Sequence, residues 1–291
     1  MAHEAMGHET IVYKRVAGHD LTVDVFAPPA AGATAARPDA SGATPALAEA
    51  SARPAIGFFH GGGWVHGSPS EFHGACERYA RSGYVTLSFG YRLSITADGT
   101  TPHPDITPVE SVKDARSALR WIRANAASLG VDADRIAAAG QSAGGQLALC
   151  TALADDVNEE TDDLSVSPTP AAIVLYASCV NTVIPWVDWH LGDRRGEIWS
   201  ISPYHLARPG MPPVIHFHGD SDCVVLPYQV RHFAGRMAEL GNSYDVVWYE
   251  GRGHYLAPEL KTYATYFDEE VLERTDRFLG ETGLEDVERR A

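Results

Sequence analysis

One serine of this chain lies in a glycine-flanked pentapeptide, Gly140-Gln141-Ser142-Ala143-Gly144. Residues 135–139 before it form a short apolar run that suits a buried strand, and residues 145–153 suit a helix with an apolar face. Gly-x-Ser-x-Gly at such a strand-to-helix turn indicates a nucleophile elbow, in which small residues allow a strained turn to expose the serine hydroxyl. An ordinary turn with a surface serine is the alternative. The matching context favours Ser142 as a nucleophile.

Serine is a weak nucleophile at neutral pH, so a base must remove its proton, and a carboxylate must hold that base in the correct tautomer. Asp222 and His254 each follow an apolar run that predicts a buried strand, and strand ends are where α/β folds place their sites. The chain order Ser142, Asp222, His254 is the order of such triads on α/β folds. Asp220 competes as the orienting acid, and we favour Asp222 because it lies further into the loop. A turn-capping aspartate and a loop histidine are the alternatives.

A glycine run, His60-Gly61-Gly62-Gly63-Trp64, follows another apolar stretch. Acyl transfer develops negative charge on a carbonyl oxygen, and preorganised backbone N–H groups must meet it; one such donor is typically worth about 100- to 1000-fold in rate. We expect these donors from Gly62 and Gly63, joined by Ala143 directly after the serine. A flexible loop is the alternative, and a phosphate cradle is disfavoured because no Gly-Lys-Ser/Thr follows. His60 is expected to brace the loop through hydrogen bonds.

Apolar runs alternate with helix-like stretches along the chain. A hairpin is expected over residues 10–26, and residues 107–110 have the form of a capping box that begins a helix ending at Gly130. Strands that alternate with helices and are apolar on both faces predict an α/β fold, with a mostly parallel central sheet and helices on both sides. The other predicted strands are 55–60, 84–89, 135–139, 171–176, 213–218 and 244–249, and the other helices are 70–82, 145–153, 229–240 and one after His254.

The length of 291 residues suits one large α/β domain, 1–291, in which no internal repeat is visible. Residues 28–54 are rich in Ala, Gly, Pro, Ser and Thr and predict a flexible surface insertion. Segment 181–200 contains Trp186, Trp189 and Trp199 and is interpreted as a lid or pocket wall. Core packing of a long excursion is an equal alternative.

The formal net charge of −15, with no offsetting cluster of Lys and Arg, disfavours nucleic acid and anionic membranes as partners. No apolar run is long enough to span a bilayer, and no signal peptide is visible, so a cytoplasmic location is expected; a trimmed signal would leave the same sequence. The four scattered cysteines are interpreted as reduced thiols, with one long-range disulfide as the alternative. The 13 histidines lack metal-ligand spacing, so no metal is expected.

These motifs together resemble the esterase/lipase branch of the α/β-hydrolase superfamily, over roughly residues 10–280 in order. The segments 13–16 and 24–28 resemble the group that contains acetyl-xylan and feruloyl esterases and kynurenine-formamidase-like enzymes. Gln141 stands where the hormone-sensitive-lipase-like group usually has Asp, which favours the first group. The matching motifs are His-Gly-Gly-Gly-Trp, Gly-Gln-Ser-Ala-Gly-Gly, Gly-Asp-Ser-Asp, Gly-Arg-Gly-His, Tyr91-Arg92-Leu93, Asp114, Asp134-Arg135-Ile136 and Ser202-Pro203.

The resemblance implies an α/β-hydrolase fold and a serine carboxylic ester hydrolase that needs no metal or organic cofactor. A small-molecule ester with a short acyl group, such as acetyl, is the expected substrate. A feruloyl or aryl esterase, an arylformamidase or another amidase would use the same machinery and are the alternatives; a binding protein that has lost catalysis is disfavoured because all three triad candidates are present. The candidate substrate-binding residues are Trp64, Trp186 and Trp189. A homodimer is compatible with the sequence.

Overall fold

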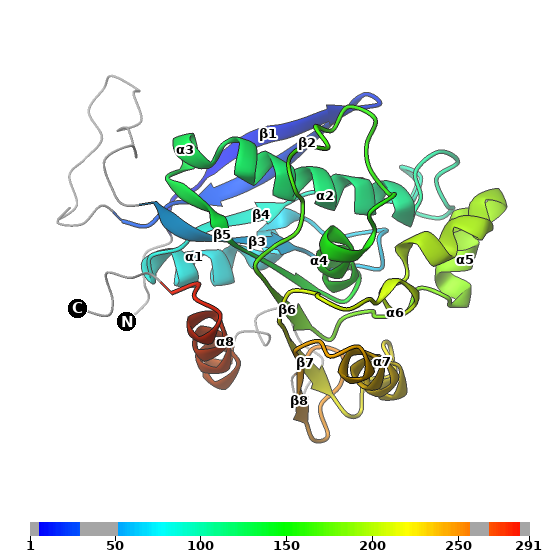
Figure 1. The fold of residues 1–291 in the computed structure, drawn as a ribbon. Helices are drawn as coiled ribbons and strands as arrows, with labels where there is room; N and C mark the ends of the chain where they lie inside the picture. Colours follow the sequence, from blue (N-terminus) through cyan, green and yellow to red (C-terminus); the bar gives the residue numbers. More distant parts are fainter. Residues whose placement is uncertain (1–5, 30–51, 257–267, 286–291) are drawn as a thin grey trace.

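The computed structural model describes residues 6–29, 52–256 and 268–285. Their strands form one eight-stranded sheet in the order β1-β2-β4-β3-β5-β6-β7-β8. Strand β2 pairs antiparallel with β1 on one side and with β4 on the other, and all neighbouring strands from β4 to β8 in this order are parallel. The predicted mostly parallel sheet of an α/β fold is therefore confirmed (Figure 1).

The strands are β1 Glu9–Val16, β2 His19–Phe26, β3 Arg53–Phe59, β4 Val85–Phe89, β5 Val131–Gln141, β6 Ala172–Tyr176, β7 Val214–Gly219 and β8 Tyr244–Tyr249. The α-helices are α1 His73–Arg81, α2 Pro108–Ala124, α3 Ala126–Leu129, α4 Ala143–Leu153, α5 Pro185–Leu191, α6 Pro203–Leu206, α7 Pro227–Glu239 and α8 Glu269–Glu281. Two 3₁₀ segments are η2 Pro69–Phe72 and η3 Gly192–Ile201.

Helices cover both faces of the sheet, and each face has its own apolar core. Helices α1 and α8 pack on one face, where they meet Phe58, Tyr176 and Phe217. Helices α2, α4 and α7 pack on the other, where alternate strand residues such as Phe59 and Leu175 point. Because successive strand side chains alternate between faces, near-continuous apolar runs are what a sheet covered on both sides requires.

Helix α2 begins as its sequence predicts. Thr107 accepts a hydrogen bond from the Val109 N–H, and the Glu110 carboxylate accepts one from the Thr107 N–H at 2.9 Å, so the capping box is complete. The predicted single helix to residue 129 is divided at Asn125 into α2 and α3, and it ends at Gly130, whose φ of 66° is the left-handed conformation that glycine favours.

Two predicted boundaries differ from the structure. Most of the predicted insertion, residues 30–51, lies outside the described residues, and its end is earlier than predicted because Arg53 and Pro54 already belong to β3. The predicted strand 135–139 is longer, Val131–Gln141, since Val131 pairs with Arg53 ahead of a register shift. The polar residues at its start concealed this extension.

A buried ion network fixes the loop after β4. Arg92 donates to both Asp114 oxygens, at 2.7 and 2.8 Å, and Lys14 of β1 donates to the same carboxylate at 2.7 Å. Glu159 contacts both cations, at 2.7 and 3.1 Å. Each charge has opposite partners, as burial requires. Asp114 also accepts from the Arg92 N–H at 2.9 Å, so the network holds the backbone next to Tyr91.

Segment 181–200 forms α5 and most of η3. Val187, Leu191 and Ile198 are buried in the core, whereas Trp189 and Trp199 are about half exposed. Arg194 ties this segment to α2 by donating to both oxygens of Glu110, at 2.9 and 3.1 Å.

Among the described residues, the four cysteines are free, and no helix has the length and apolar character to cross a membrane.

Substituting Glu110→Gln is expected to lower the free energy of unfolding by about 2 kcal/mol at neutral pH, because a buried carboxylate with several charged partners is lost. Burial raises the pKa of Glu110, but its bonds to Arg194 and Thr107 outweigh burial and lower the pKa to about 2. The Glu110 contribution to the free energy of unfolding is complete above the pKa of an unfolded glutamate, near 4.5, and it is lost as the pH falls toward 2. Urea unfolding from neutral pH to pH ~3.5 measures it.

The matched control is Glu197→Gln, since Glu197 binds the same Arg194 but is 43% exposed. Its effect should stay below about 1 kcal/mol. An equal loss of unfolding free energy in both variants would contradict the stabilising role of the Arg194–Glu110 ion pair. A loss in Glu110→Gln that does not become smaller in acid would contradict it as well.

Candidate active site

Ser142 occupies the turn between β5 and α4 with φ 52° and ψ −115°, a conformation that side-chain-bearing residues rarely adopt. Its N–H donates to the Tyr176 carbonyl and its own carbonyl accepts from Cys179, each at 3.0 Å. The chain after β6 therefore supports the strained turn on both sides. The predicted elbow geometry is present at Ser142.

Glycines make this turn possible because other backbones pass very close. A Cβ on Gly144 would lie 2.0 Å from the Phe59 carbonyl oxygen and 2.3 Å from that of His60. A Cβ on Gly140 would lie 2.3 Å from the Gly144 oxygen. Only residues without a side chain fit at these two positions.

The structure brings the predicted acid and base together. His254 Nδ1 lies 2.8 Å from Asp222 Oδ2, and both residues are buried. Asp222 Oδ1 accepts from the N–H groups of Val224 and Val225, at 2.8 and 3.0 Å. With Oδ1 bound to these two N–H groups, Oδ2 faces Nδ1 of His254, and Nε2 is the imidazole nitrogen that does not contact the carboxylate.

Asp220, the competing acid, lies elsewhere. It is exposed, and its Oδ1 accepts from the Gly251 N–H at 2.7 Å. It thus joins the loop after β7 to the loop after β8, on which His254 lies, without touching the imidazole.

His218 also contacts Asp222, at the same carboxylate oxygen that His254 contacts, and was not singled out as a site residue by the sequence. Its Nε2 donates to the Val225 carbonyl at 3.0 Å and lies 3.5 Å from Asp222 Oδ2. Burial lowers the pKa of His218, and the Asp222 charge opposes this effect. Its place at the end of β7, four residues before Asp222, is the signal that could have identified it.

Gln141, directly before the serine, also reaches His254. Its Nε2 lies 3.2 Å from His254 Nε2, the imidazole nitrogen that does not contact Asp222, and its buried Oε1 has no hydrogen-bond partner among the described residues. Gly61 packs closely against the Gln141 amide, since a Cβ on Gly61 would lie 1.7 Å from Oε1. No spacing rule connects a residue of the elbow to a histidine 113 positions away, so the sequence did not reveal this contact.

The predicted oxyanion loop turns sharply beside Ser142. Gly62 and Gly63 have φ values of 99° and 60°, and the Gly62 carbonyl accepts from the N–H groups of Val65 and His66. Ala143 is the first residue of α4, so its N–H has no acceptor within the helix. Gly62 and Gly63 line the same cavity as Ser142. Ala143, the residue that follows Ser142 in the sequence, is buried.

Three side chains from outside the loop, those of Tyr91, Gln146 and Trp186, hold it in place. The Tyr91 hydroxyl donates to the carbonyls of His60 and Gly61, at 2.9 and 3.1 Å, and the His60 ring stacks on the Tyr91 ring at 4.2 Å. Burial lowers the pKa of His60 to about 4, so this ring is neutral at physiological pH. The other two anchors are Gln146, which accepts from Trp64 Nε1 at 3.0 Å, and Trp186, whose Nε1 donates to the Gly63 carbonyl at 3.1 Å.

A cavity of about 290 Å³ opens over Ser142 and His254. Trp64 and Trp186 line it, whereas Trp189 does not; the Trp189 ring packs against the Trp186 ring at 5.6 Å. Burial raises the pKa of the Cys179 thiol in its wall to about 12, which leaves that thiol protonated. The lining residues are Gly62, Gly63, Trp64, His66, Gln141, Ser142, Cys179, Ile184, Trp186, Val224, Val225, His254 and Tyr255.

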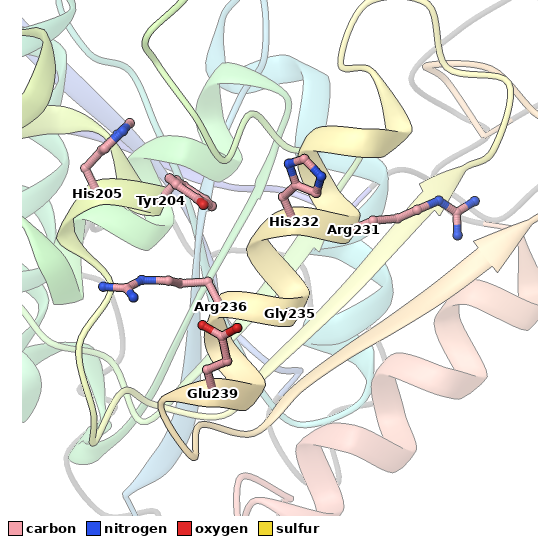
Figure 2. A pocket seen from close by; sticks show the side chains of 7 residues that line it. All are labelled: Tyr204, His205, Arg231, His232, Gly235, Arg236 and Glu239. Atoms are coloured by element: carbon pink, nitrogen blue, oxygen red, sulfur yellow. The ribbon is translucent and has the colours of Figure 1, made fainter.

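A larger hollow of about 610 Å³ lies between α6 and α7, but it is a poor candidate for the reacting site. It contains none of the predicted triad, and its side chains diverge: Arg231 turns away from Tyr204 and His205 (Figure 2). The Arg231 guanidinium instead lies 4.2 Å above the Trp248 ring. Chemistry, rather than volume, therefore locates the site at Ser142.

The sheet order and the serine turn at the end of β5 define an α/β-hydrolase. The family model BD-FAE matches residues 44–186. Esterase LipC of Mycobacterium tuberculosis is 31% identical over 208 residues, which cover 65% of this chain and 49% of that protein. Carboxylesterase NlhH of the same organism is 37% identical over 179 residues, 60% and 53% of the two chains. This chain therefore spans about half the length of these curated relatives.

A solved structure matches over nearly its whole length. The apo form of Thermogutta terrifontis esterase 2 is 35% identical, with 97% of each chain covered and a TM-score of 0.80. This chain belongs to the esterase/lipase branch of the α/β-hydrolase superfamily.

Substituting Gly144→Ala is expected to lower the free energy of unfolding by at least about 3 kcal/mol, because the new methyl would meet two carbonyl oxygens that cannot both move. Gly235→Ala in α7 is the matched control, since a Cβ there meets nothing within 4 Å. That variant should gain about 0.5–1 kcal/mol from helix propensity. Urea denaturation measures both; a Gly144→Ala protein as stable as the parent would refute the close approach.

Proposed function

We propose that this protein is a serine carboxylic ester hydrolase that acts through an acyl-enzyme. The observation that carries the proposal is that His254, which lies 2.8 Å from Asp222, lines the same cavity as the strained Ser142. The names of the relatives, an esterase and a carboxylesterase, support the reaction class.

The proposed mechanism has two half-reactions. His254 Nε2 accepts the hydroxyl proton as Ser142 Oγ bonds to the ester carbonyl carbon, and the carbonyl oxygen becomes an oxyanion that the N–H groups of Gly62, Gly63 and Ala143 bind. The imidazolium then protonates the leaving alcohol as the C–O bond breaks. Water repeats the sequence on the acyl-enzyme, with His254 again as base and then as acid, and releases the carboxylic acid. Asp222 orients His254 and stabilises its positive charge throughout.

The substrate is proposed to be a small ester with a short acyl group. The cavity of about 290 Å³ is at the lower end of the usual range for ligand pockets, and its walls are mostly apolar or aromatic. Thermogutta terrifontis esterase 2 has been solved with propionate and with butyrate bound, which supports an acyl site of this size.

Hydrolysis of an aryl ester or of an amide is the alternative to hydrolysis of a short-chain ester. A feruloyl or aryl esterase, an arylformamidase or another amidase would use the same triad and oxyanion donors. Trp186 at the cavity wall is compatible with an aromatic group, and relative rates on acetyl esters and formyl amides distinguish these possibilities.

The first test is hydrolysis of p-nitrophenyl esters from acetate to decanoate. The chain is expected to have its highest kcat/KM with acetate to butyrate and to lose activity toward decanoate, because a long acyl chain exceeds the cavity. Ser142→Ala should lower kcat at least about 10⁴-fold on every ester. Its folding is checked by circular dichroism. Activity that survives in Ser142→Ala would remove Ser142 as the nucleophile.

The two aspartates provide a matched pair. Asp222→Asn is expected to lower kcat by about 10³- to 10⁴-fold, because an amide there favours the wrong tautomer of His254. Asp220→Asn keeps a side-chain oxygen for the Gly251 N–H and should stay within about threefold of the parent. Steady-state kinetics on p-nitrophenyl acetate decides between them: a larger loss in Asp220→Asn would reverse the assignment of the orienting acid.

A further inference from the structure

Two histidines and one aspartate meet on the face of the sheet that α1 covers. Asp24 lies in the middle of β2, His73 is the first residue of α1, and His8 directly precedes β1. Asp24 Oδ2 lies 2.8 Å from His73 Nε2, and Asp24 Oδ1 lies 3.9 Å from His8 Nε2. Within the described part of the chain, this is the one group of three such side chains whose donor atoms all lie within 4.8 Å of one another.

We propose that His8, Asp24 and His73 bind one divalent transition-metal ion, with zinc as the representative ion. Two neutral imidazoles and a carboxylate are a donor set that zinc prefers, and three protein ligands leave a position for water. Calcium and magnesium are disfavoured, because they prefer oxygen ligands alone. The site is separate from Ser142 and does not depend on the proposed hydrolase activity.

The donor atoms need only small adjustments to reach coordination distances. Zinc bonds of about 2.0–2.2 Å place neighbouring ligand atoms about 3.3 Å apart in a tetrahedron. The His73–Asp24 pair is already closer than this, and the metal would replace the proton that joins them. His8 has to approach by less than about 1.5 Å, which rotation of its partly exposed side chain can supply.

The surroundings hold the ligands in orientation. The Thr10 hydroxyl donates to Asp24 Oδ1 at 2.7 Å, the kind of outer contact that orients a metal-binding carboxylate. Thr10 and Asp24 are directly paired across β1 and β2, so the backbone fixes this contact. Phe26 packs against both imidazoles, with its ring centroid 4.9 Å from that of His8 and 5.1 Å from that of His73.

Binding would connect three elements that are far apart in sequence. The metal would join the chain just before β1 to β2 and to the start of α1, at the antiparallel end of the sheet. Because the unfolded chain does not hold these ligands together, the binding free energy adds to the free energy of unfolding. The consequence is a metal-dependent stability of this end of the sheet.

The test is isothermal titration of the full-length, chelator-treated and desalted protein with zinc chloride at neutral pH. It is repeated with cobalt(II) chloride, whose visible absorption reports its coordination. A Cys223→Ser background removes an exposed thiol that could compete for zinc. We expect one ion per chain and a Tm raised by about 5 °C at a hundredfold excess over Kd.

The variants distinguish this site from binding elsewhere. His8→Ala is decisive, since His8 is exposed at the edge of the fold and its loss should leave folding intact. It and His73→Ala should each weaken zinc binding at least about tenfold, since loss of an outer contact alone typically costs 10- to 100-fold. His232→Ala, an exposed histidine of α7, is the control and should bind as the parent does. The proposal fails if no saturable binding occurs, or if His8→Ala binds zinc as tightly as His232→Ala.

Discussion

The close approach of α4 to the end of β3 is the constraint on which the candidate site depends. The chain at Gly144 touches the carbonyls of Phe59 and His60, so the nucleophile turn and the oxyanion loop are placed by direct backbone contact. No side chain lies between them that could repack and alter their spacing. The strained Ser142 conformation is then held by hydrogen bonds to Tyr176 at the end of β6 and to Cys179 just after it. Two neighbouring strands on opposite sides of β5 thus determine where the serine hydroxyl lies.

The acid and base depend on a second backbone contact, between the loops after β7 and β8. A Cβ on Gly219 would lie 2.1 Å from the Arg252 carbonyl oxygen, and the Ser221 N–H donates to that same oxygen at 3.0 Å. Asp222 therefore meets His254 because their loops are joined just upstream of both residues. The 2.8 Å contact of Asp222 with His254 is a consequence of this join as much as of the attraction between the two groups.

Local patterns in the sequence were sufficient to predict the mostly parallel sheet and the capping box. They also led to Ser142, Asp222 and His254 as candidates, because each follows a strand and parallel strands end at one edge. Contacts between distant side chains were not accessible in this way. Three such contacts depend on how loops fold back over the sheet. They are the contact of Gln141 with His254, the ion pair of Arg194 with Glu110, and the hydrogen bond from Trp186 to the Gly63 carbonyl. The two histidines around Asp24 likewise have no ligand spacing, since only strand pairing and the docking of α1 bring them together. Composition likewise does not distinguish Trp186, which lines the cavity, from Trp189, whose ring packs against the Trp186 ring.

The cavity walls differ in how freely they can change. Trp186 is both a wall of the cavity and a brace of the oxyanion loop, because its indole N–H binds the Gly63 carbonyl. A smaller side chain there would widen the cavity and at the same time release the loop that carries the proposed N–H donors. Val224 also lines the cavity, but only its backbone N–H is used, by Asp222, and its side chain is 63% exposed. Substitutions of the Val224 side chain can therefore change the shape of the cavity while the proposed triad and the proposed oxyanion donors stay in place. Specificity for the proposed ester substrates can then change most easily at the start of the loop that leads into α7.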